Sequence, residues 1–133
     1  MKVYIAASFG ARTRLRPYRD KLWEMGLEVV SSWLDEVAHP PEMDEATFKK
    51  KLAIKDLAEV KSADLLLLDS LETKSGGGKS TEFGIALGKF QSMLIYRVGP
   101  ARNVFHYLAD QTFHTWPECI KFMKLTHGVK LGD

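Results

Sequence analysis

Residues 75–82 read SGGGKSTE and combine groups that bind anions with a carboxylic acid. Glycines let the backbone approach a ligand closely, and a helix that starts after them favours negative charge at its N-terminus. The end of the run, Gly78-Lys79-Ser80, looks like part of the phosphate-binding P-loop of a nucleotide triphosphatase. The alternative is that the glycines serve Glu82, which would lie in the first turn of that helix.

The P-loop interpretation fails on spacing. The motif requires a glycine five positions before the glycine of Gly-Lys-Ser, and this sequence has Thr73 there. A P-loop also follows its strand directly, whereas residues 70–74 separate the preceding apolar run from the glycines. The next strand-like segment ends in Arg97 and Val98 instead of an acid that would bind magnesium. We therefore expect no hydrolysis of ATP or GTP.

A second acid, Asp56, stands where a carboxylate is costly. It shares one helical face with three apolar residues at offsets of −4, +4 and +7, namely Leu52, Val60 and Ala63. Burying a carboxylate without compensation is expensive, so Asp56 either makes a structural hydrogen bond or points into a cleft. Glu82 has a structural alternative too, because an acid in the first turn of a helix complements the helix dipole.

Strand-like and helical patterns alternate along the chain. Apolar runs predict strands at 3–7, 27–33, 63–70 and 92–99, and helical spacing predicts helices near 15–25, 45–63, 80–90 and 117–124. This alternation is typical of a parallel α/β sandwich, and no linker or repeat divides the chain. We expect a single domain over residues 1–133.

The carboxyl ends of the strands are the expected ligand site. In open parallel sheets ligands bind beyond these ends, at the point where the strand order reverses. In a flavodoxin-like order the first and third strands flank that point. Their outgoing loops, SFGARTRLR and SLETKSGGGKSTE, are rich in groups that suit phosphate and sugar. Glu82 ends the second loop, which favours a role in chemistry over a purely structural one.

Composition argues against several classes of protein. The net charge of +2 is too small to indicate a surface for nucleic-acid polymers, and no apolar run approaches the roughly 20 residues that span a bilayer. The single cysteine, Cys119, excludes an internal disulfide and fits a reducing cytoplasm. The four histidines lack metal-ligand spacing with each other or with that cysteine. We expect a cytoplasmic protein without a metal, a cofactor or a membrane partner.

Taken together, the motifs resemble the nucleoside 2-deoxyribosyltransferase family, including its relatives that hydrolyse deoxynucleoside 5′-monophosphates. The similarity opens with a tyrosine in the first strand, VYIAAS, and continues with DLAEVKSADLLLLD, in which Asp56 precedes Asp64 by eight residues. It closes with the glycine-rich loop, Glu82 and FGIALGK. No single motif is specific, so their order and spacing carry the resemblance, which covers most of the chain.

The resemblance implies a flavodoxin-like three-layer sandwich with a parallel sheet of about five strands. It implies that Glu82 attacks the anomeric carbon, that Asp56 handles the proton of the departing base, and that the Tyr4 hydroxyl positions Glu82. A deoxyribosyl-enzyme would form and pass its sugar to water or to another base, without a cofactor. Such displacement needs one ionised carboxylate and one proton donor, which two acids in different environments can supply.

The glycine-rich loop departs from the transferases. Ser75 and three glycines stand where the transferases commonly carry an aspartate that contacts the base, and the hydrolases tend to have a phosphate-binding serine there. The first loop is basic enough to hold a 5′-phosphate, although its arginines also suit a solvated helix start. We expect substrate contacts from both loops: Ser8, Gly10, Arg12 and Arg14 in the first, and Ser75, Gly77, Gly78 and Ser80 in the second.

Members of the family are oligomers in which a loop from a neighbouring subunit completes each site. The matching segment contains Arg102 and Asn103, and we expect Asn103 to reach the neighbour in a homodimer or larger homo-oligomer. Trp33 and His39 follow the second strand and suit packing or the surface better than a base contact. We expect the ligand to be a small-molecule nucleoside or nucleotide. Two other functions of the protein stay open: a glycohydrolase of the NAD type, and a binding module without turnover.

Overall fold

The computed structural model describes residues 1–36, 40–72, 78–89 and 92–128, and within these ranges five parallel strands form one sheet. The strands are β1 (Lys2–Ala6), β2 (Glu28–Val29), β3 (Leu65–Asp69), β4 (Leu94–Val98) and β5 (Gln111–Phe113), in the order β2-β1-β3-β4-β5. The helices are α1 (Arg12–Glu24), α2 (Glu45–Ser62), α3 (Gly78–Gly88) and α4 (Trp116–Thr126). Short 3₁₀ helices lie at η1 (Phe9–Ala11), η2 (Ser32–Asp35) and η3 (Val104–Leu108).

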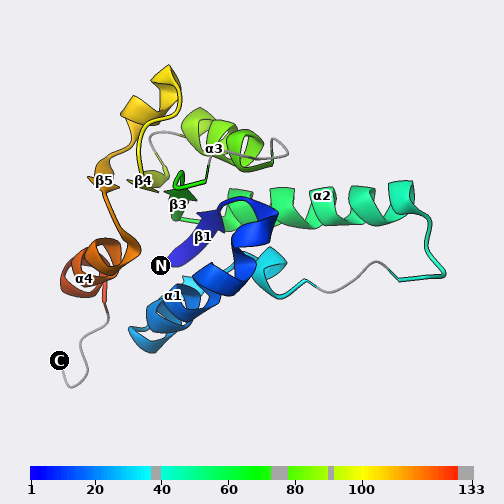
Figure 1. Ribbon diagram of the computed structural model, residues 1–133, viewed down its shortest axis with the longest axis horizontal. Coiled ribbons are helices and arrows are strands. Elements are labelled where there is room, and N and C mark those ends of the chain that lie inside the picture. The colour runs from blue at the N-terminus through cyan, green and yellow to red at the C-terminus, as the bar shows by residue number, and fades with distance from the viewer. Residues whose placement is uncertain (37–39, 73–77, 90–91, 129–133) are drawn as a thin grey trace.

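The sheet is the middle layer of a three-layer sandwich. Helices α2 and α3 contact each other on one face, and α1 and α4 contact each other on the other (Figure 1). The predicted α/β class and the flavodoxin-like strand order are therefore confirmed. No helix in the described part of the chain is both long and apolar enough to cross a bilayer.

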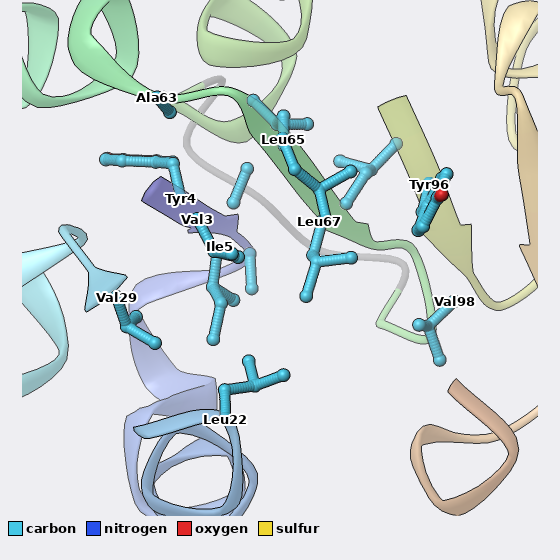
Figure 2. Packing of buried hydrophobic residues seen from close by; sticks show 14 of the residues in the cluster. Val3, Tyr4, Ile5, Leu22, Val29, Ala63, Leu65, Leu67, Tyr96 and Val98 are labelled. Atoms are coloured by element: carbon cyan, nitrogen blue, oxygen red, sulfur yellow. The ribbon is translucent and has the colours of Figure 1, made fainter. Parts of the chain in front are cut away.

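The core consists of the central strands and the helix faces that cover them. All five residues of β3 are buried, as are four of the five in β1. Such continuously apolar strands fit a parallel sheet, because helices cover both of its faces. Side chains of β1, β3 and β4 pack in one cluster with Leu22 of α1 and Val29 of β2 (Figure 2).

The second strand is shorter than the sequence predicted. Only Glu28 and Val29 pair with β1, whereas a strand was expected over residues 27–33. The chain turns into η2 instead. Trp33 in this turn is bound to β1, because its Nε1 donates to the carbonyl oxygen of Ile5 at 2.7 Å. The fifth strand, β5, has no apolar run of its own, and sequence patterning did not locate it.

The carboxyl ends of β3 and β4 are held close together. Gly99, directly after β4, has φ +114°, and a Cβ atom there would stand 2.8 Å from Oγ of Ser70. Only glycine takes this conformation readily and allows the close approach. The Ser70 hydroxyl donates to the carbonyl oxygen of Pro100 at 2.7 Å, which ties the two outgoing loops together. The loops that leave β3 and β4 are therefore packed closely together at the edge of the sheet where we expect a ligand to bind.

Candidate active site

Tyr4 and Glu82, predicted to act together, are in hydrogen-bond contact. Tyr4 lies in β1, between β2 and β3, and its side chain is fully buried. Its hydroxyl donates to Oε2 of Glu82 on α3. The sheet therefore orients the Glu82 carboxylate through a residue 78 positions away in the sequence.

Helix α3 carries Glu82 on the side that faces a cavity. Three of its residues are buried, namely Phe83 and Ala86 in the core and Lys79 at its edge, where the ammonium group binds the carbonyl oxygen of Glu72. Four other residues, spaced so that they share a second face, line the cavity: Gly78, Thr81, Glu82 and Ile85. This division of faces places the Glu82 carboxylate where the protein interior meets an open volume.

Asp56 reaches the same cavity from α2. The cavity lies between α2 and α3, has a volume of about 620 Å³, and has apolar lining that includes Leu52, Leu57 and Ile85. A volume of this size accommodates a small organic ligand. Oδ1 of Asp56 is buried and has no hydrogen-bond partner among the described residues. Buried polar atoms are nearly always paired, so an unpaired carboxylate oxygen on a residue that lines a cavity marks Asp56 as a candidate functional group.

The protein environment raises the pKa of Glu82 and of Tyr4. Burial raises the pKa of Glu82 to about 8, with the negative charges of Asp56 and Glu59 adding to it and the Tyr4 hydrogen bond opposing it. Burial, and then the charge and hydrogen bond of Glu82, raise the pKa of Tyr4. The tyrosine hydroxyl therefore stays protonated and remains the donor in the pair.

The pKa of Asp56 is raised as well, to about 6, and burial is again the main cause. The positive charge of Lys55 lowers this pKa, while the negative charges of Glu36 and Glu59 raise it. Because Asp56 also acts on Glu82, the two acids titrate as a pair. Near neutral pH the pair holds one proton between two carboxyl groups.

The first predicted loop follows β1 and forms η1. Ser8 is half-buried, and Gly10 is exposed with open space where a Cβ atom would stand. Arg12 donates to the carbonyl oxygens of Phe9 at 3.2 Å and Glu36 at 2.5 Å, and its guanidinium lies 3.8 Å from the centre of the Phe9 ring. Arg12 thus connects η1 to the end of η2.

Arg14 already has two carboxylate partners. It pairs with Asp69 at 2.8 Å and with Glu72 at 3.2 Å. Asp69 is 1% exposed and also accepts a hydrogen bond from Nε1 of Trp116 at 2.7 Å. Arg14 therefore compensates a buried charge, and a substrate phosphate would have to share or replace these partners.

The second predicted loop is described only in part. Ser75 and Gly77 lie outside the described residues, Gly78 begins α3, and Ser80 is exposed in its first turn. Lys79 is 7% exposed and donates to the carbonyl oxygen of Glu72 at 3.1 Å. Lys79 therefore connects the start of α3 to the loop that follows β3.

Asn103 and Trp33 have structural contacts within the chain. Oδ1 of Asn103 accepts from the backbone N–H groups of Phe105 and His106, at 2.9 and 3.2 Å, and so caps η3. Trp33 is 5% exposed and packs in the core, as expected. His39 lies outside the described residues.

Sequence analysis missed three charged residues around Asp56. Lys55 donates to the carboxylate of Glu36, and Oε1 of Glu59 accepts from the backbone N–H of Ser32 at 3.3 Å. Glu59 stands three positions after Asp56, a spacing that could have revealed it. Glu36 carries no such signal, because its position depends on the turn into η2.

No group of three or more histidine, cysteine, aspartate or glutamate residues in the described ranges is arranged to hold a metal ion. Cys119 is fully buried, and burial raises the pKa of its thiol to about 12. A thiol in this setting is protonated at neutral pH and a poor nucleophile. Among the described residues that line the cavity, Glu82 and Asp56 carry the carboxyl groups.

Solved structures with the same arrangement of elements include a 2-deoxyribosyltransferase from Bacillus psychrosaccharolyticus. It aligns with a TM-score of 0.74 and 16% identity, over 98% of each chain. The chain has the fold of the 2-deoxyribosyltransferases. The resemblance inferred from the sequence is thus confirmed at the level of the fold.

Two further structures share this fold. A CMP N-glycosidase from Clostridium botulinum aligns with a TM-score of 0.57 and 17% identity, over 94% of this chain and 99% of that one. A 2-desoxiribosyltransferase from Leishmania mexicana aligns with a TM-score of 0.60 and 12% identity, over 95% of this chain and 98% of that one. No protein-family profile matches the sequence, and neither does any curated protein.

Proposed function

We propose that this protein cleaves or exchanges the N-glycosidic bond of a 2′-deoxynucleoside or its 5′-monophosphate, through a covalent deoxyribosyl–Glu82 intermediate. One observation carries the proposal: two carboxyl groups with different surroundings, Glu82 and Asp56, face one cavity. Glu82 is oriented by Tyr4, and Asp56 has a buried oxygen without a partner. The fold shared with deoxyribosyltransferases and with an N-glycosidase supports it further.

The reaction proceeds in two displacements. In the first, an ionised Glu82 oxygen attacks the anomeric carbon, the bond to the base nitrogen breaks, and Asp56 gives the departing base a proton. In the second, water or another base attacks the same carbon and releases Glu82. Asp56, now ionised, accepts the proton of the attacking group, which restores the starting state.

The Tyr4 hydrogen bond favours the protonation state that the first step needs. Donation by the hydroxyl stabilises the ionised form of Glu82, but burial still holds the pKa of Glu82, at about 8, above that of Asp56, at about 6. In the empty site the shared proton therefore rests mainly on Glu82, and it has to move to Asp56 before the attack. As the sugar gains positive charge in the transition state, the nearby Glu82 carboxylate becomes more stable as an ion. The proton on Asp56 is then at the atom from which the base receives it.

We propose further that a second copy of the chain completes the site. Four large apolar side chains of η3 are exposed, among them Val104 at 71% and Tyr107 at 77%. An exposed apolar cluster on so short an element is typical of an interaction surface. Asn103, which begins η3, would then lie beside the neighbouring cavity.

Base release from a panel of substrates tests the proposal. The panel contains deoxynucleosides, their 5′-monophosphates and NAD, each incubated with and without an acceptor base, with products separated by chromatography. We expect free base from a deoxynucleoside or its monophosphate with the wild-type chain and none with Glu82→Ala. Cleavage of NAD alone would favour an NAD-type glycohydrolase, and binding without product would favour a module without turnover.

A further inference from the structure

Lys55 is next to Asp56 on α2, yet its ammonium group is bound elsewhere. It pairs with Oε1 of Glu36, whose side chain is only 9% exposed. Oδ1 of Asp56, one residue away, has no partner among the described residues. A buried carboxylate is strongly stabilised by a cation, and the adjacent lysine is long and flexible enough to move toward it. In the structure the Lys55 ammonium pairs with Glu36 instead.

Glu36 is itself held by its backbone. Its N–H donates to the carbonyl oxygen of Trp33 at 3.1 Å, and its own carbonyl oxygen accepts from Arg12 at 2.5 Å. Trp33 is anchored in turn by its hydrogen bond to β1. The Glu36 carboxylate therefore stands on a fixed segment, and Lys55 is the partner that comes to it.

None of the other described groups near Asp56 supplies it with a positive charge in place of Lys55. Glu59 on α2 and Glu82 on α3 are acids, and Tyr4 on β1 is a neutral donor bound to Glu82. The cavity is also lined by Lys49, but that lysine pairs with Glu45 at 2.7 Å. Lys49, which lines the cavity, and Lys55, which does not, are thus both bound to glutamates, and neither pairs with Asp56.

We propose that Glu36 is a positioning residue that holds the Lys55 ammonium away from Asp56, so that Asp56 remains able to carry the proton of the departing base. This inference rests on the proposed function for its use in catalysis. A carboxyl group paired with an ammonium ion stays ionised and has no proton to give. Glu36 therefore protects the acid without touching the substrate.

The charges define the expected direction of change. Glu36→Gln removes a negative charge near Asp56 and frees Lys55, and both effects should lower the pKa of Asp56, together by about one unit or more. Lys55→Met removes the cation and should raise that pKa. The double variant Glu36→Gln/Lys55→Met removes one charge of each sign and should return the pKa close to its wild-type value.

Carboxyl-carbon NMR titration of the labelled protein measures this pKa without substrate, and Asp56→Asn identifies the resonance. Glu28→Gln, an exposed residue at the start of β2, is the matched control for loss of one negative charge and should leave the titration unchanged. The inference is overturned if Glu36→Gln leaves the Asp56 titration in place. It is also overturned if the double variant titrates as low as Glu36→Gln, since Lys55 would then play no part.

Activity separates this inference from the proposed function. If the chain releases base, Glu36→Gln should lower kcat and shift the acidic limb of the pH profile downward, with little change in KM. The double variant should recover both properties. Absence of base release from every substrate, with the NMR shifts as expected, would contradict the proposed function while leaving the positioning of Lys55 by Glu36 supported.

Discussion

The Glu82 carboxylate is held by a hydroxyl group that the sheet itself supplies. Because Tyr4 is fully buried in a central strand, the oxygen that it binds has little freedom to move. Asp56 stands opposite on a different helix, and its buried Oδ1 lacks a partner in the described chain. This arrangement suits the proposed roles, attack for Glu82 and proton transfer for Asp56, and each role can be tested by substitution.

Glu82→Ala should reduce base release by several powers of ten, because the covalent route is removed entirely. Ground-state binding should change little, since most of the cavity lining is apolar and remains. Single-turnover kinetics and calorimetric binding of the same substrate test the two expectations. Near-normal activity in a folded variant would contradict the role of Glu82 as nucleophile.

Asp56→Asn keeps the shape of the side chain but cannot deliver a proton. The loss in kcat should be largest for substrates whose base leaves poorly and should shrink for chemically activated bases that need no proton. A series of nucleosides with leaving groups of graded basicity measures this trend. An equal loss across the series would show that Asp56 is structural.

The pH dependence of kcat/KM should be bell-shaped. Activity needs one proton on the pair, so it falls below about pH 6, where Glu82 and Asp56 are both protonated. It falls again above about pH 8, where both are ionised and no proton donor remains. Asp56→Asn should remove one of the two limbs, and a flat profile between pH 5 and 9 would contradict the paired titration.

At the scale of secondary-structure elements, a substitution in the segment after β1 tests whether the substrate is a nucleoside or a nucleotide. Arg12→Ala removes a guanidinium that binds two backbone carbonyl oxygens and the Phe9 ring and has no carboxylate partner among the described residues. If this group contacts a 5′-phosphate, its loss should weaken the binding of the monophosphate by about 1.5–3 kcal/mol and raise KM accordingly. KM for the plain nucleoside should change little. Equal turnover of both substrates by the wild-type chain would remove the reason to expect a phosphate contact.

Arg14→Ala is a poorer probe of phosphate binding and serves as the contrast. It leaves the buried carboxylate of Asp69 without its cation, so we expect a loss of stability on the order of 2 kcal/mol, visible in thermal unfolding. Arg12→Ala should leave the unfolding midpoint nearly unchanged. A KM effect in Arg14→Ala therefore indicates phosphate binding only if the variant is fully folded in the assay.

Elements with strong periodicity could be predicted from the sequence, and those defined by long-range contacts could not. Continuous apolar runs revealed β1, β3 and β4, and helical spacing revealed α2 over nearly its full length. The end of β2 was wrong because Trp33 is fixed by a hydrogen bond to β1, which no local pattern encodes.

The candidate site shows the same division. Glu82 and Asp56 could be found because each stands out locally, one after glycines and one on an apolar helix face. The ion pair between Lys55 and Glu36 could not be predicted, because it joins residues from two segments and the local sequence pattern of neither segment indicates the other partner. The partners of Arg14 were missed for the same reason.

At the level of the whole molecule, the exposed face of η3 predicts an assembly. Light scattering should show a dimer or a larger species, and Phe105→Ser with Leu108→Ser should dissociate it, because these side chains are 59% and 60% exposed in the single chain. Activity should fall on dissociation. Leu125→Ser, which removes a side chain that is 75% exposed on α4, is the control and should change neither property.

The position of β1 has a consequence for how the protein is made. Strand β1 leaves the ribosome before the other four strands of the sheet yet lies in its interior, and one of its neighbours, β3, begins at Leu65. At synthesis rates of about 5–20 residues per second, the apolar stretch of β1 waits roughly 3–12 s for that partner. During this interval the nascent chain exposes a strand with unpaired edges, which is the kind of segment that chaperones bind and that aggregates. The strand that carries Tyr4 is therefore also a segment of the nascent chain that remains without its β3 partner for several seconds.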